Sequence, residues 1–161
     1  MENSQGLKKP FRSAVTVALA LLVSLAVYIV LALLLKASRP YHRPILKPET
    51  ANLVRLGFYG LAILQVIIIR VMRGLFFQKA PGLIAASLGR RLMLVSIFTS
   101  VFSEVPALLG FILFLLAGLT RDLYVLVFVS LVLMFMFFPR FRYWEEWAAE
   151  QQSLPAERPK P

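Results

Sequence analysis

The chain has 161 residues, of which 59% are hydrophobic and 16% charged, and its formal net charge is +10. Soluble domains are typically about 45–50% apolar and about 25% charged, so this composition excludes an ordinary soluble globule, a disordered tail and a soluble nucleic-acid binder. The absence of cysteine excludes a disulfide framework and a thiolate zinc site, and the single histidine argues against a histidine-rich metal site. These properties predict an all-α, polytopic membrane protein.

The first predicted span covers residues 14–35, an uncharged run that follows Lys8, Lys9 and Arg12. A bilayer core about 30 Å thick requires about 20 apolar residues, which this run supplies. It is longer than the apolar core of a signal peptide, which has about 7–15 residues, so we expect a retained span. Residues 1–13 are then a cytoplasmic N-terminal segment.

Three further spans are predicted, at 53–72, 92–119 and 123–138. The second is bounded by Arg55 and Arg70, whose long side chains can reach the membrane interface. The third exceeds the hydrocarbon thickness, which predicts a tilt or a kink, and it contains Pro106. Residues 120–122 leave room only for a tight hairpin, so the last two spans should be antiparallel neighbours.

Four spans place both termini on one side of the membrane. That side and the loop after the second span carry twelve of the 18 lysines and arginines, and the opposite side carries six. This bias favours a bacterial inner (plasma) membrane protein with both termini in the cytoplasm. The basic residues are scattered over several loops, which favours the lipid bilayer and its anionic headgroups as partners rather than nucleic acid.

An amphipathic helix is predicted at 140–152, where Tyr143, Trp144 and Trp147 follow the last span. Aromatic rings with one polar atom favour the headgroup level, so we interpret these three residues as interfacial anchors; the alternative is a helix that docks on a partner. The helix completes a membrane domain at 14–152. The prolines beyond it predict a disordered tail at 153–161.

Glu104 lies near the middle of the third span, where a charge is costly and therefore faces the bundle interior. Pro106 removes a hydrogen bond from the carbonyl of Phe102. This free carbonyl and the hydroxyls of Ser100 and Ser103 make the surroundings of Glu104 polar. Gln65 in the second span has a similar depth, and we expect it to hydrogen-bond Glu104. Glu104, Gln65, Ser100 and Ser103 are thus ion-binding candidates; the alternative is that Glu104 only joins helices.

Small residues line one stripe of the same span. The stripe contains Ser96, Ser100, Ser103, Ala107 and Gly110. In lipid, small side chains let helices approach closely, and close packing replaces the hydrophobic driving force. We therefore predict that this stripe is a helix-packing surface.

The polar stretch at 89–91, the apolar run after it and the segment Phe-Ser-Glu-Val-Pro-Ala-Leu-Leu-Gly-Phe-Ile-Leu at 102–113 define a recognisable pattern. Residues 79–113 resemble the carboxylate-bearing helix of rotary-ATPase c-type (proteolipid) subunits. In that family a basic polar loop precedes a helix whose glutamate carries a proton or a sodium ion. The resemblance implies this role for Glu104 and places residues 79–81 near the polar loop.

The chain lacks a P-loop, a nucleophile elbow and a zinc-protease motif, and Glu104 has no evident second titratable group for acid–base chemistry. We therefore expect neither an enzyme nor a bound cofactor or metal. The expected function is that of a non-enzymatic subunit or assembly partner that acts through helix–helix packing, as a homo-oligomer or with a membrane partner subunit. The alternative is a proton- or cation-handling protein that uses Glu104.

Overall fold

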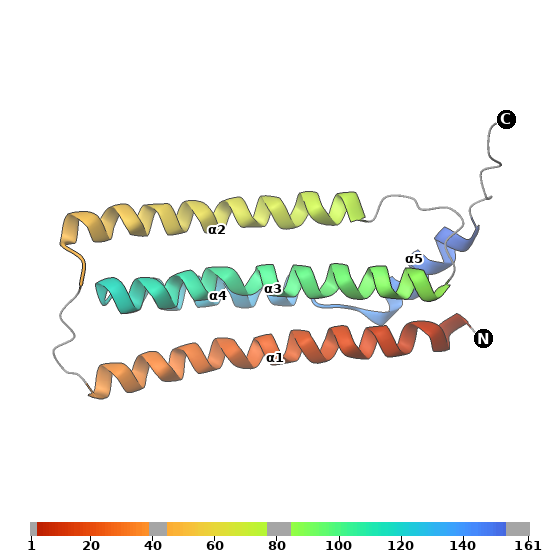
Figure 1. The fold of residues 1–161 in the computed structure, drawn as a ribbon, viewed down its shortest axis with the longest axis horizontal. Coiled ribbons are helices and arrows are strands. Elements are labelled where there is room, and N and C mark those ends of the chain that lie inside the picture. The colour runs from red at the N-terminus through yellow and green to blue at the C-terminus, as the bar shows by residue number, and fades with distance from the viewer. Residues whose placement is uncertain (1–2, 39–44, 77–84, 154–161) are drawn as a thin grey trace.

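The computed structural model describes residues 3–38, 45–76 and 85–153, of which 93% are helical and none forms a strand. The helices are α1 (Asn3–Ser38), α2 (Pro48–Phe76), α3 (Ala85–Ala117), α4 (Thr120–Met136) and α5 (Phe141–Ser153). Figure 1 shows α1, α2 and α3 side by side with α4 behind α3, and α5 at the bundle end where α1 begins. The predicted all-α class is confirmed. Residues 154–161 of the predicted disordered tail lie outside the described residues.

Three helices are long and apolar enough to cross a membrane. The qualifying segments are Gly6–Ser38, Pro48–Leu75 and Leu88–Ala117. Helix α4 is shorter, and it passes the same test only as a pair with α5, to which it is bent by 49°. The part of the chain that the structure describes therefore has three candidate spans, or four if the bent pair counts as one.

The helices differ in their limits from the predicted spans because hydropathy marks only the apolar part of a helix. Helix α1 includes residues 3–13, and α2 begins at Pro48, a position where the fixed φ of proline suits a helix start. Helix α3 passes through Pro106 as one element but ends at Ala117 rather than at 119. Helix α4 occupies residues 120–136 rather than 123–138.

The turn between α3 and α4 explains these last two limits. Gly118 has a φ of 68°, which lies in the left-handed region that glycine enters without steric cost. Its N–H donates to the carbonyl of Phe114 (2.8 Å), and the N–H of Thr120 donates to the carbonyl of Gly118 (2.9 Å). Residues 120–122, predicted to form the hairpin, instead form the first turn of α4.

Helix α3 is the centre of the bundle, with backbone neighbours in α1, α2 and α4. Its small residues are used inside the chain: Ser100, Ser103, Ala107 and Gly110 are buried, and Ser96 is half-buried. A Cβ at Gly110 would lie 2.9 Å from the Cβ of Leu126 and 3.2 Å from the Cα of Leu123. The absence of a side chain at Gly110 therefore allows α3 and α4 to touch.

Two apolar clusters hold the helices together. The first joins the middle of α1, α3 and α4, and contains Leu25, Ala32, Ala107, Phe114, Leu123, Val127 and Met134. The second lies at the end of the bundle and joins the beginnings of α1 and α3 to α5; it contains Leu7, Ala14, Leu88, Leu92, Trp144, Trp147 and Ala148. Neither cluster contains a described residue of α2.

Candidate functional site

Glu104, on α3, points toward α1. One carboxyl oxygen, Oε1, accepts a hydrogen bond from the hydroxyl of Tyr28 (2.7 Å) and lies in hydrogen-bond contact with the hydroxyl of Ser24. Only 7% of Glu104 is exposed, so this acid is within the bundle as predicted. The contact joins the central polar group of α3 to two hydroxyls spaced one turn apart on α1.

Aromatic rings cover this polar group toward the hairpin end of α3. The ring of Tyr28 stacks on Phe111, with centroids 5.6 Å apart and planes at 28°. Phe111 in turn stacks on Phe114, with centroids 6.5 Å apart. These rings place apolar surface next to the contact between Tyr28 and Glu104.

The expected hydrogen bond between Gln65 and Glu104 is wrong. Gln65 is buried, with 5% of its surface exposed, yet neither Oε1 nor Nε2 of its amide has a partner among the described residues. Glu104 turns instead to α1, because its position on α3 lies on the side that packs against Ser24 and Tyr28. The structure therefore does not bring Gln65 into the Glu104 site.

The serines near Glu104 are buried but do not hydrogen-bond its carboxyl group in the described structure. The hydroxyl of Ser103 donates to the carbonyl of Thr99 (2.7 Å), within its own helix. Ser100 is 6% exposed. Among the described residues, Glu104 is the one ion-binding candidate with a side-chain hydrogen bond to another helix.

Ser130 of α4 hydrogen-bonds the backbone of α3 on both sides of Pro106. Its hydroxyl accepts a hydrogen bond from the N–H of Ala107 (2.8 Å) and lies 3.4 Å from the carbonyl oxygen of Glu104, to which it donates. Ser130 is completely buried, and Pro106 lies between these two backbone groups. A polar side chain of a neighbouring helix thus stabilises the backbone next to the buried acid.

The sequence interpretation missed Ser24 and Tyr28. A signal for them exists, because Thr16 is the only other side chain with a polar atom in the uncharged run at 14–35. Their spacing of four residues places both hydroxyls on one helix face. Since Glu104 needs hydrogen-bond partners in lipid, such a face on a neighbouring span is the natural place for it.

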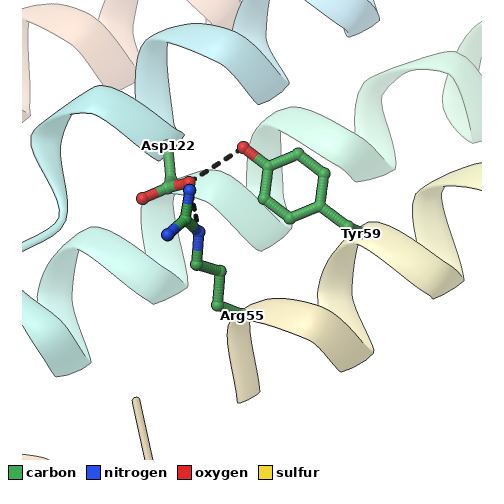
Figure 2. A network of polar contacts seen from close by, with 3 residues as sticks. All are labelled: Arg55, Tyr59 and Asp122. Atoms are coloured by element: carbon green, nitrogen blue, oxygen red, sulfur yellow. Dashed lines mark hydrogen bonds and ion pairs between the residues drawn. The ribbon is translucent and has the colours of Figure 1, made fainter. Parts of the chain in front are cut away.

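A second polar network joins α2 to α4 at the opposite end of the bundle from α5. Figure 2 shows Arg55 and Tyr59 reaching from α2 toward Asp122. Oδ1 of Asp122 lies 2.8 Å from Nε of Arg55 and accepts a hydrogen bond from the hydroxyl of Tyr59 (2.9 Å). The guanidinium carbon of Arg55 is 5.9 Å from the centroid of the Tyr59 ring.

This network is asymmetric in its exposure. The side chain of Asp122 is 4% exposed and that of Arg55 is 46% exposed, so water screens the arginine but not the acid. Asp122 also lies in the first turn of α4, where the helix dipole favours a negative charge. The antiparallel topology places Arg55 and Asp122 at the same end of the bundle, a proximity that no local pattern in the sequence indicates.

The tail helix does not present its tryptophans to the headgroups, which corrects the expected role of Trp144 and Trp147. They are 2% and 7% exposed, and both belong to the cluster with the beginnings of α1 and α3. The ring of Phe11 meets Phe141 and Trp144 edge to face, at centroid distances of 5.1 Å and 5.4 Å. Of the three predicted anchors, Tyr143 alone is substantially exposed, at 45%.

The described residues contain no group of three or more histidine, cysteine, aspartate or glutamate side chains that could hold a metal ion.

Comparisons with known proteins add no relationship: no family model matches the chain, and neither the curated proteins nor the solved structures contain a significant match.

Proposed function

We propose that this protein is an integral membrane protein that acts as a non-enzymatic subunit or assembly partner through helix–helix packing. The observation that carries the proposal is the exposure of its apolar helices. Only 17% of the most apolar window of α1 and of α2 is buried inside the chain, against 44% for α3. Such surfaces require lipid or another membrane helix around them.

In the proposed arrangement α4 is the fourth span and α5 lies at the membrane surface, turned away from α4 by 49°. Both ends of the chain then lie on one side, which we assign to the cytoplasm of a bacterium. Twelve of the 18 lysines and arginines belong to that side, as the positive-inside rule requires. The assignment places the α5 end of the bundle at the cytoplasmic surface and the Arg55–Asp122 network at the other surface.

Helix α2 is the surface best suited to receive a neighbouring helix. The stripe of small residues on α3 is already used inside the chain, whereas α2 has backbone neighbours only in α3 among the described helices. Gly57 and Gly60 are exposed on α2, and a Cβ at either would meet nothing within 4 Å. A helix from a second copy or from another membrane protein can approach closely at these glycines.

We predict that a single cysteine at Ile63, beside these glycines, forms cross-links under mild oxidation in lipid. The chain has no cysteine of its own, so Ile63→Cys reports only this surface. Ile63 is 65% exposed, and the matched control Val23→Cys on α1 is 63% exposed. Purified protein in vesicles tests a second copy, and native membranes test a different partner. Leucine at both Gly57 and Gly60 should abolish the cross-link. Equal yields for Ile63→Cys and Val23→Cys in both settings would contradict the proposal.

A second candidate function, proton or cation handling at Glu104, is favoured by the surroundings of its carboxyl group. Glu104 is 7% exposed, and its Oε1 lies against the hydroxyls of Ser24 and Tyr28. Acidic side chains inside a membrane bundle commonly belong to proton or ion pathways.

This second function predicts that a hydrophobic carbodiimide, which reacts with protonated carboxyl groups, labels Glu104 in the lipid-embedded protein. Mass spectrometry should locate the adduct at Glu104 and show its loss in Glu104→Gln. Suppression by rising pH alone indicates a proton site, and suppression by sodium at constant pH indicates a cation site. If Glu104 stays unlabelled while a control membrane carboxyl group reacts, the second function is excluded and the packing function is retained.

A further inference from the structure

A cavity of about 480 Å³ opens at the α5 end of the bundle, where α4 and α5 meet the ends of α2 and α3. Its charged lining side chains are Arg73, Arg140, Arg142 and Glu146. Glu146 pairs with Arg142 at 3.0 Å on the exposed surface of α5. Arg73 and Arg140 are the two further arginines among the described residues that line the cavity.

These two arginines differ in their surroundings. Arg73 is half-buried in the last turn of α2, with its guanidinium carbon 4.9 Å from the centroid of the Phe137 ring. Arg140 is exposed and immediately precedes α5. The first N–H groups of a helix lack intrahelical acceptors, so the beginning of α5 adds further donors at the rim of the cavity. Ser96 adds a hydroxyl from α3.

Apolar side chains line part of the remaining wall, beside the polar Thr99 and Tyr143. Val95, Met136 and Phe137 line it, and Met136 is 57% exposed toward the outside of the bundle. A shallow crevice of about 10 Å³ between α2 and α3 shares Arg73, Val95 and Thr99 with the cavity. Phe98 and Phe102 also line this crevice. A ligand that fits both parts has an anionic group next to an apolar chain.

The depth of the cavity matches such a ligand in a membrane. The last turn of α2 and the end of α4 are where the apolar segments stop, which is the level of lipid phosphates in the proposed arrangement. A half-buried guanidinium at this level binds phosphate oxygens with charge-assisted hydrogen bonds, and a phosphate at a helix N-terminus is further stabilised.

We propose that this cavity binds the phosphate group of an anionic phospholipid between Arg73 and Arg140, with an acyl chain along Met136 and Phe98. The inference rests on the proposed membrane-spanning arrangement, and it adds a defined site to the general attraction of basic helix ends for anionic lipid. The bound lipid joins α2 to the bend between α4 and α5, two regions whose described residues share no apolar cluster.

The test uses the full chain purified in detergent and stripped of lipid, with bound lipid counted by native mass spectrometry. Dioleoyl phosphatidylglycerol should bind about tenfold or more tightly than dioleoyl phosphatidylcholine. The variant Arg73→Gln/Arg140→Gln should lose this preference. Arg90→Gln, which removes an exposed arginine of α3 outside the cavity, should keep it. A steric variant, Ser96→Leu, should also weaken binding without a change in charge.

Equal affinity for the two lipids would overturn the proposal. So would an unchanged lipid preference in both cavity variants, provided that they remain helical by circular dichroism. An equal loss of the lipid preference in Arg90→Gln would also overturn it. Inorganic phosphate distinguishes the remaining source of the ligand, because displacement of the lipid by phosphate alone at comparable concentration would assign the cavity to a free anion. Flotation with phosphatidylcholine vesicles tests membrane insertion separately. A chain that floats but shows no lipid preference contradicts only the site, whereas one that fails to float contradicts the proposed function.

Discussion

Trp144→Ala is expected to destabilise the protein by about 3–5 kcal/mol and to release α5 from the bundle. Trp144 is the largest fully buried side chain, and it packs between α1 and α3 at the end of the bundle. Truncation to alanine removes its contact with Phe11 and leaves a cavity that the surrounding helix ends cannot easily fill. The thermal midpoint in mild detergent should fall accordingly.

Limited trypsin digestion gives a local measure of the same effect. Cleavage after Arg142 should accelerate in Trp144→Ala. The Arg142 side chain is already exposed, but trypsin needs an extended backbone, which the first turn of α5 adopts more often once the helix detaches. Tyr143→Ala is the matched control, since it removes a neighbouring ring that is 45% exposed and should lower the midpoint much less. Equal effects of the two substitutions would show that α5 does not depend on the buried indole.

Gly110→Leu is expected to separate α3 from α4 and to destabilise the protein by about 3 kcal/mol. Even the first carbon of a side chain at this position would lie 2.9 Å from the Cβ of Leu126, and the Cα of Leu123 is 3.2 Å away. The obstacle includes backbone, which cannot rotate aside, so the helices themselves must move. Denaturation by sodium dodecyl sulfate should shift to a lower concentration.

Gly74→Leu is the control for this substitution. Gly74 lies in the last turns of α2, and a Cβ there would meet nothing within 4 Å. Because leucine has a better helix propensity than glycine, this change should be neutral or slightly stabilising. A stable Gly110→Leu variant would mean that α3 and α4 are farther apart than the structure has them.

The Glu104 site shows how far a local sequence pattern predicts a buried polar contact. The burial of Glu104 followed from its position in an apolar span, and hydropathy is a property of the sequence alone. The hydrogen-bond partners of Glu104 could not be predicted in this way. Gln65 lies on one neighbouring span and the pair Ser24 and Tyr28 on another, both near the depth of Glu104. The choice between them depends on the rotation of α3 about its own axis, which Gly110 and Ser130 influence through their contacts with α4.

The tail helix is the clearest case of tertiary structure overriding composition. Aromatic residues with polar atoms after a span are typical of interfacial anchors, and the spacing of Trp144 and Trp147 places them on one face. That face is covered because the chain bends by 49° after α4, which lays α5 against the beginnings of α1 and α3. The Arg55–Asp122 pair likewise required knowledge of which helix ends meet.

The sequence by itself determined the all-helical class, the positions of the apolar helices, the turn region between α3 and α4 and the interior location of Glu104. Each of these follows from local composition or from the cost of a polar group in an apolar span. Tertiary structure alone decided the pairing of Glu104 with α1, the Asp122 network, the burial of the tryptophans and the arginine-lined cavity. These features bring together side chains far apart in the sequence, and their relative positions depend on how all the helices pack at once.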